Sequence, residues 1–186
     1  MKQLVPSIEM TIGPFFPVEF GQGANDLTAF GGKPARGEVF EIAGRVTQED
    51  GAPLFNLVLE IWQADANGIF SYPTDPRHPQ ADPNFHGWGR AATDAQGDFR
   101  FLTIRPGAYE RRAPHVNLLL LHSGLTRQLQ TVIFFEGEPA NATDPVLASV
   151  EPAALRARLV AKKEVPGKYR FDIRLRGEGE TPFFGD

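Results

Sequence analysis

Cysteine is absent from the 186 residues of this sequence, which excludes disulfide bonds, thiolate catalysis and zinc-thiolate sites. The sequence also lacks any apolar run approaching the roughly 20 residues that span a bilayer, and residues 1–6 do not form a secretory signal. A net charge of -4 provides no basic surface for nucleic acid. These absences predict a cytoplasmic protein that binds neither nucleic acid nor membrane.

Methionine is scarce as well, with 2 residues against 15 phenylalanines, whereas 16 prolines and 19 glycines mark frequent turns. Aromatic and β-branched segments separated by turn residues are typical of β-rich domains. The predicted strands cover residues 39–46, 57–62, 99–104, 115–123, 128–135 and 168–176. The last of these alternates apolar and polar residues, which predicts a half-buried antiparallel strand.

The remaining segments carry few helical signals. Residues 150–162 predict one short helix near the C-terminus, because apolar residues recur at helical spacing after a proline. Residues 1–38 predict an extended N-terminal arm, and residues 73–90 a long loop. We therefore expect an all-β fold, a β-sandwich over residues 39–186, with a closed barrel as the alternative.

Tyr109, His115 and Asn117 look like half of the side-chain ligands of a metal site. If residues 115–123 form a strand, positions 115 and 117 share one face of it. Imidazole is a strong ligand for iron, copper or zinc, whereas a carboxamide oxygen is a weak one. The alternative is that these three residues are buried and hydrogen-bond to one another without any metal.

Three further segments carry a resemblance to a known family. They are E-I-W-Q-A at residues 60–64, D-P-N-F-H-G-W-G-R at residues 82–90 and I-R-P-G-A-Y at residues 104–109. Together they resemble the intradiol ring-cleavage dioxygenases, and specifically the two-subunit protocatechuate 3,4-dioxygenases, over most of residues 7–135. The resemblance implies a sandwich of mixed sheets that holds one ferric ion with two tyrosines and two histidines.

The resemblance also implies that this chain has lost part of that ligand set. Phe70 stands where the family has its first tyrosine, and Tyr109 matches the second. The family's H-x-H pattern is His115 followed by Asn117, so one histidine remains. One phenolate and one imidazole are too few to hold a ferric ion against hydrolysis. We expect this chain to bind no iron itself.

Other positions extend the comparison to the substrate pocket. Arg112 matches a family arginine, and Val132 replaces a family glutamine, so both are expected to be remnants of a pocket. Thr11, Gly13 and Pro14 match the T-x-G-P motif of the α-type chains. In the family that arm crosses to the iron-bearing β subunit and lines its substrate pocket.

The resemblance therefore implies an α-type chain in a bacterial hetero-oligomer of αβ units. Its β partner would bind Fe(III), and the assembly would convert protocatechuate and O2 to 3-carboxy-cis,cis-muconate. One alternative is a self-sufficient dioxygenase with an altered metal site formed by Tyr72, Tyr109, His115 and Asn117. The other is a non-enzymatic β-sandwich that serves as a scaffold or a binding module.

Overall fold

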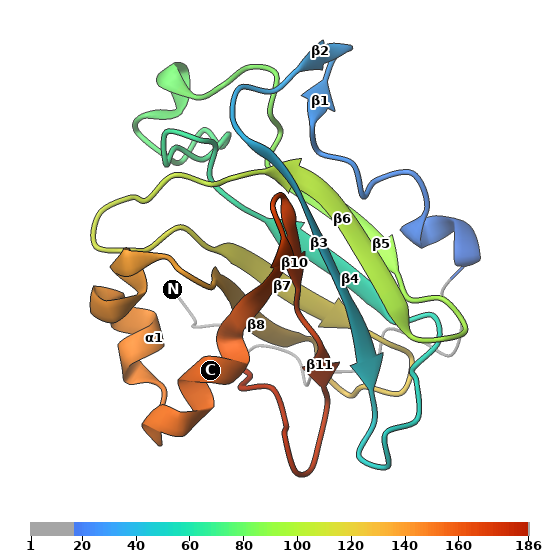
Figure 1. Cartoon of the computed structure of the whole chain (residues 1–186). Helices are drawn as coiled ribbons and strands as arrows, with labels where there is room; N and C mark the ends of the chain where they lie inside the picture. Colours follow the sequence, from blue (N-terminus) through green and yellow to red (C-terminus); the bar gives the residue numbers. More distant parts are fainter. Residues whose placement is uncertain (1–16, 186) are drawn as a thin grey trace, which may run out of the picture.

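The structure is a computed structural model that describes residues 17–185 (Figure 1). Its strands are β1 (Ala29–Phe30), β2 (Lys33–Pro34), β3 (Val39–Thr47), β4 (Val58–Trp62), β5 (Trp88–Ala92), β6 (Asp98–Ile104), β7 (Val116–Leu121), β8 (Leu129–Phe135), β9 (Val160–Val165), β10 (Lys168–Arg170) and β11 (Ile173–Arg174). Its helical segments are α1 (Pro145–Ser149) and the 3-10 helices η1 (Val18–Gly21), η2 (His78–Gln80), η3 (Pro139–Thr143) and η4 (Ala153–Leu159). None of these helices is long and apolar enough to cross a membrane.

The strands β3 to β11 form two layers of one mixed, curled sheet, which confirms the predicted all-β sandwich, and β1 and β2 form a separate two-stranded sheet. One layer has the antiparallel order β8-β7-β4-β5, and the other has the order β9-β10-β3-β6 (Figure 1). A short parallel pairing of β8 with β9 connects the layers. Among the described strands, β5 and β6 share no ladder, so the sheet remains open and the closed-barrel alternative is wrong.

The main core lies between the two layers. In β3, Phe40, Ile42 and Val46 are buried on one face, and in β7 Leu118 and Leu120 are buried opposite them in the same cluster. This spacing of two follows from the strand geometry, which sends successive side chains to opposite faces. Burying each such large apolar side chain contributes about 1.5–3 kcal/mol.

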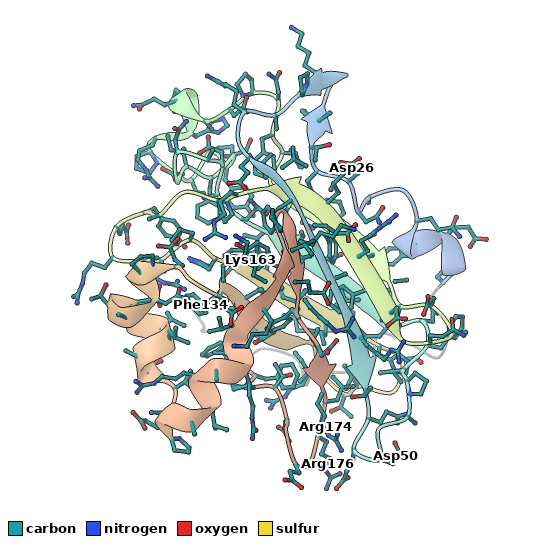
Figure 2. All side chains as sticks on the ribbon, viewed as in Figure 1. Asp26, Asp50, Phe134, Lys163, Arg174 and Arg176 are labelled. Carbon is teal, nitrogen blue, oxygen red and sulfur yellow. The ribbon has the colours of Figure 1, made fainter. Side chains whose placement is uncertain are left out.

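A second, smaller core covers the outer face of β8. Val132 and Phe134 point away from the main core and pack with Leu147, Val150 and Leu159 from the helical segment. Figure 2 shows Phe134 between β8 and this segment, which is drawn in orange. The helices therefore protect the part of the sheet that adjoins the candidate site.

The helix predicted over residues 150–162 is only partly correct. Its central part is the 3-10 helix η4, whereas Val160 begins the strand β9. The chain becomes extended there because Val160 and Ala161 pair with the end of β8. Long-range strand pairing thus overrides the local helical spacing of the apolar residues.

The loop predicted over residues 73–90 ends too late. Residues 88–90 belong to β5, which pairs with β4 along its whole length, from Val58 opposite Ala92 to Trp62 opposite Trp88. Two glycines and a preceding proline-rich segment conceal this strand in the sequence.

The strand predicted over residues 168–176 is broken into β10 and β11. The alternation of burial is as expected, with Phe171 and Ile173 buried, but both strands run parallel to β3 rather than antiparallel. The break occurs where the Phe171 carbonyl approaches Gly44 of β3, since a Cβ at Gly44 would lie 1.9 Å from that oxygen. Only β9 pairs with β10 in the antiparallel sense.

Residues 17–27 pack on the edge formed by β5 and β6. Isolated bridges join Ala24 to Arg90 and Asp26 to Leu102, and Leu27 belongs to the main core. The division of the chain into an arm of residues 1–38 and a domain of residues 39–186 stays a prediction.

Candidate functional site

Tyr109 and His115 lie in the connection between β6 and β7, and their side chains are in contact. The Tyr109 hydroxyl is 3.1 Å from Nε2 of His115, and Nδ1 of His115 is 2.6 Å from the Ala113 carbonyl oxygen. A carbonyl oxygen only accepts, so Nδ1 carries the ring proton and Nε2 accepts from the phenol. This arrangement satisfies both ring nitrogens and the hydroxyl within the chain.

Burial keeps both groups neutral. His115 is 3% exposed, and its removal from water lowers its pKa from 6.5 to about 4, with the nearby Arg112 charge acting in the same direction. Burial also raises the pKa of Tyr109 above its ordinary value of 10.0. At neutral pH the pair is therefore a phenol bonded to an uncharged imidazole.

Phe70 lies against the same tyrosine. Its ring meets that of Tyr109 edge to face at 5.2 Å, and it stacks on Tyr72 at 5.8 Å with an interplanar angle of 11°. Tyr72 is 40% exposed and lies on the solvent side of this aromatic group. Phe70 thus places an apolar ring, without a phenolic oxygen, against Tyr109.

Two glycines allow the loops that carry these rings to meet. Gly68 has a φ of +74°, and a Cβ there would lie 2.2 Å from the carbonyl oxygen of Ala108. A Cβ on Gly107 would lie 2.5 Å from the carbonyl oxygen of Ala66. Only glycine tolerates this positive φ and this close backbone approach together. The contact places the turn before Phe70 directly beside Tyr109.

Buried carboxylates hold the same turn in shape. Asp65, which is 2% exposed, accepts hydrogen bonds from the backbone N–H groups of Asn67 and Ile69 at 2.8 and 3.0 Å. Its second oxygen accepts from the backbone of Asp82 at 2.9 Å. Asp65 therefore joins the turn that precedes Phe70 to the loop that begins at Asp82.

Asn117 occupies a strand position next to this pair. It lies opposite Trp62 of β4 and Val132 of β8, so all three share the outer face of the sheet. Its amide Nδ2 donates to the Trp62 carbonyl oxygen at 3.3 Å. The predicted sharing of a face by residues 115 and 117 agrees with this register, in which position 115 would continue opposite Phe134.

Arg112 is fastened to a carboxylate that sequence reasoning missed. Its Nε donates to Asp144 at 2.9 Å, and Asp144 is fully buried. Asp144 also accepts from the backbone of Ala113, Val146 and Leu147, the last two at the start of α1. Burial opposes its ionisation, but these hydrogen bonds and the Arg112 charge outweigh that effect and lower its pKa. An aspartate directly before Pro145 is an N-cap signal that could have identified it.

A pocket of about 380 Å³ opens beside the aromatic group. Its lining residues are Trp62, Phe70, Tyr72, Thr74, Asp75, Pro76, Arg77, Tyr109 and Glu110. Asp75 accepts from the Phe70 backbone at 3.3 Å, and its bond with the Arg77 side chain lowers its pKa to about 2. Asp75 and Arg77 therefore neutralise each other, and Glu110 is a third charged residue in the lining.

The donor set at this site does not fit a ferric ion. The resemblance implies two phenolates and two imidazoles, and the chain provides one phenol and one imidazole that already bond to each other. Phe70 has no donor, and Asn117 contributes at best a weak carboxamide. Within residues 17–185, no three His, Cys, Asp or Glu side chains gather closely enough to hold a metal ion.

The remaining predicted site residues either belong to the second core or fall outside the part of the chain that the structure describes. Thr11, Gly13 and Pro14 fall outside the described residues. Val132 is buried in the second core, 8% exposed, beneath the helical segment. Of the predicted positions, the structure therefore brings Phe70, Tyr109 and His115 into contact, and it adds Asp144 as the partner of Arg112.

The chain is similar to known dioxygenases over most of its length. The family model described as Dioxygenase matches residues 11–177. The α chain of protocatechuate 3,4-dioxygenase from Pseudomonas putida is 40% identical over 161 residues, 81% of this chain and 77% of that protein. The α chain from Burkholderia cepacia is 35% identical and covers 99% of both chains. The β chain from Burkholderia cepacia is also 35% identical, over 97% of this chain and 85% of that protein.

Solved structures show the same fold. The dioxygenase domain of a carbohydrate-binding fusion protein from Streptomyces sp. SirexAA-E has a TM-score of 0.61 and 26% identity, covering 92% of this chain and 98% of that one. A 3-chlorocatechol 1,2-dioxygenase from Rhodococcus opacus 1CP has a TM-score of 0.64 at 24% identity, covering 90% and 71%. With the family match over residues 11–177, these findings establish that the chain belongs to the intradiol dioxygenase family.

Proposed function

We propose that this chain is the α-type subunit of a two-chain protocatechuate 3,4-dioxygenase. The assembly cleaves the ring bond between the two hydroxyl-bearing carbons of protocatechuate and adds both atoms of O2, which gives 3-carboxy-cis,cis-muconate. The observation that carries the proposal is the hydrogen bond between Tyr109 and His115. It occupies the only two donors that remain from the family's four ligand positions.

This chain's own residues make the remnant site stable without a metal. The Tyr109 hydroxyl keeps its proton, since burial raises its pKa, and it donates that proton to the neutral His115. Ferric iron requires the opposite state, a deprotonated phenolate that faces the ion. Phe70 then fills the adjacent space with an apolar edge. The site thus contributes stability rather than chemistry.

The catalytic iron belongs, in this proposal, to a β partner. Ferric iron, which is typical of the family, supplies the activation of the catechol for attack by O2. Curated relatives named as α chains and as β chains of one enzyme support a two-chain assembly. Thr11, Gly13 and Pro14 are proposed to complete the partner's substrate pocket, where a small backbone edge and a threonine hydroxyl suit a polar substituent.

Purification of the chain alone and with its β partner tests the proposal. The isolated chain is expected to be colourless and inactive, whereas the complex shows tyrosinate-to-iron charge-transfer absorption and cleaves protocatechuate. Truncation of residues 1–16 is expected to raise the KM for protocatechuate in the complex and to leave its iron content unchanged. A coloured and active lone chain would overturn the proposal.

A second candidate is a self-sufficient dioxygenase with an altered metal site. It is favoured by the 35% identity to the Burkholderia cepacia β chain, which equals the identity to the α chain of the same species. It requires Tyr72, Tyr109, His115 and Asn117 to bind a metal, although the Asn117 amide already donates to Trp62. Stoichiometric metal in the isolated chain that is lost in Tyr109→Phe would support this candidate.

A non-enzymatic scaffold is the third alternative. It predicts that removing residues 1–17 leaves the turnover of any dioxygenase partner unchanged, for KM as well as kcat.

A further inference from the structure

Residues 17–27, here called the strap, lie along the edge of the sheet beside β5 and β6, where Figure 1 draws them in blue. The backbone N–H of Arg90 donates to the Ala24 carbonyl at 2.8 Å, and that of Leu27 donates to the Leu102 carbonyl at 2.8 Å. The Leu27 side chain is 5% exposed and belongs to the main core. The C-terminal half of the strap is therefore an integral part of the fold.

Glycines seat the strap closely against β5. A Cβ on Gly21 would lie 2.4 Å from the Cβ of Ala92, and a Cβ on Gly89 would lie 2.4 Å from the Leu27 side chain. Both positions leave no space for a side chain on the side where strap and strand meet. These close contacts therefore fix the position of the strap against β5.

Arg90 fastens the N-terminal end of the strap. It stands opposite Glu60 on the neighbouring strand, and its Nε and Nη2 both donate to Oε1 of that carboxylate, the former at 2.8 Å. The guanidinium carbon lies 3.7 Å from the ring centroid of Phe20 and 5.0 Å from that of Trp88. Its Nη1 also donates to the Phe20 carbonyl at 3.4 Å.

The cluster of Arg90, Glu60 and Phe20 is here called the clasp; its charged pair is partly shielded from solvent, and Phe20 is 39% exposed. The side chains of Arg90 and Glu60 are 20% and 17% exposed, so solvent screens their charges only in part. Because the Glu60 carboxylate fixes the orientation of the Arg90 guanidinium, its planar face can attract the Phe20 ring. Phe20 is thus held by its ring and by its backbone at once.

We propose that Arg90 is a positioning residue for the N-terminal arm, through the clasp. The inference rests on the proposed function, in which Thr11, Gly13 and Pro14 complete the partner's pocket. Pro14 is six residues from Phe20, so an extended chain reaches at most about 20 Å from the clasp. If the clasp and the neighbouring contact of Gly21 with Ala92 were both lost, Ala24 would be the next anchor, ten positions from Pro14, and the reach would grow to about 34 Å.

The shorter tether confines the arm near one place. The effective concentration of a tethered group falls roughly as the −3/2 power of the tether length, so lengthening from six to ten residues lowers it about twofold. The clasp therefore affects binding of protocatechuate at the partner's site without touching the substrate. It is expected to change KM rather than kcat.

Steady-state kinetics of the αβ complex test this role. Phe20→Ala and Arg90→Gln are each expected to raise the KM for protocatechuate about twofold or more, with kcat and iron content unchanged. Phe55→Ala is the matched control, because Phe55 is 55% exposed and lies outside the clasp. The same substitutions in a chain that lacks residues 1–16 are expected to have no further effect on KM.

The outcomes separate the clasp from the proposed function. If removal of residues 1–16 leaves KM unchanged, the role of the arm fails, and the clasp proposal fails with it. If that removal raises KM but Phe20→Ala and Arg90→Gln do not, the clasp proposal alone is wrong. If Phe20→Ala raises KM equally in the truncated chain, the residue acts on the fold rather than on the arm, and the proposal is also overturned.

Discussion

At the scale of single residues, Phe70 and Asn117 stand where the resemblance implies a tyrosine and a histidine. These two residues remove one phenolate and one imidazole from the expected ligand set. The remaining Tyr109 and His115 then satisfy each other, which a buried pair must do to avoid the loss of unmade hydrogen bonds. Which donors are missing stays a prediction from the resemblance, and the structure shows that Tyr109 and His115 bond to each other.

Replacing Phe70 and Asn117 with the residues that the resemblance implies tests whether these two positions prevent iron binding. In Phe70→Tyr/Asn117→His the isolated chain would again have two tyrosines and two histidines around one position. We expect it to retain iron and to gain charge-transfer absorption in the visible range, because phenolate and imidazole are strong ligands for this ion. Phe70→Tyr alone is the control, with three donors and weaker retention. Equal iron content in the double variant and the unaltered chain would contradict the expectation.

The depressed pKa of His115 gives a dependence of stability on pH. Burial lowers its pKa from 6.5 in the unfolded chain to about 4 in the fold, so the unfolded state binds more protons in that interval. The contribution of His115 is therefore complete above pH 6.5 and is lost as the pH falls towards 4. Between pH 7 and pH 5 the loss amounts to about 2 kcal/mol.

Urea denaturation at these two pH values measures that effect. The free energy of unfolding of the unaltered chain is expected to fall more between pH 7 and pH 5 than that of His115→Gln. The comparison between the two proteins removes the contribution of carboxylates, which titrate in both. An identical pH dependence in the two proteins would show that His115 does not carry it.

At the scale of elements, Asp144 connects a helix with the site. It caps α1 through the backbone of Val146 and Leu147, and it pairs with Arg112 in the connection that carries His115. Sequence reasoning placed a helix only at residues 150–162 and missed this cap. The five-residue α1 is too short for a periodic pattern, so the Asp-Pro signal was the available evidence for it.

Asp144→Asn is expected to destabilise the protein by about 3 kcal/mol, because it leaves the Arg112 guanidinium partly buried without its counter-charge. Equilibrium denaturation in urea measures the change. Asp50→Asn is the control, since Asp50 is exposed and bonds only to a turn N–H at Ala52, so its effect stays within about 0.5 kcal/mol. A loss at Asp144 no larger than this control would show that the ion pair does not stabilise the fold.

The success of the strand predictions depended on what determined each strand. The strands β3, β4, β6, β7 and β8 were predicted within a few residues, because their apolar pattern is a local property. The first half of β9 falls in the predicted helix and most of β5 in the predicted loop, because the conformations of both strands depend on partners far along the chain. The break between β10 and β11 likewise follows from a contact with Gly44.

At the scale of the whole molecule, the described residues form the two-layer sandwich of the family. The family model covers residues 11–177, and the two layers enclose a continuous core. A fold retained with an altered site fits a subunit that contributes surface and an arm to a partner's chemistry. Similarity alone does not separate the α-type from the β-type, since both Burkholderia cepacia chains are 35% identical.

Metal analysis of the assembled enzyme provides the matching prediction. We expect one iron per αβ pair, because only the β chain would have the complete ligand set. Elemental analysis of the purified complex, with the isolated α-type chain as a control, measures this ratio. Two irons per pair would show that Tyr109 and His115 bind a metal in the assembly.

The sequence by itself determined the family, because its motifs are local and are read directly; the missing donors stay a prediction from the resemblance. It also determined most strands, since burial on one face imposes a period of two. Only the tertiary structure decided that Tyr109 bonds to His115, that Gly68 brings Phe70 beside them, and that Arg90 fastens the strap. These contacts join segments that are separate in the chain, so they depend on packing and strand register, which no local pattern records.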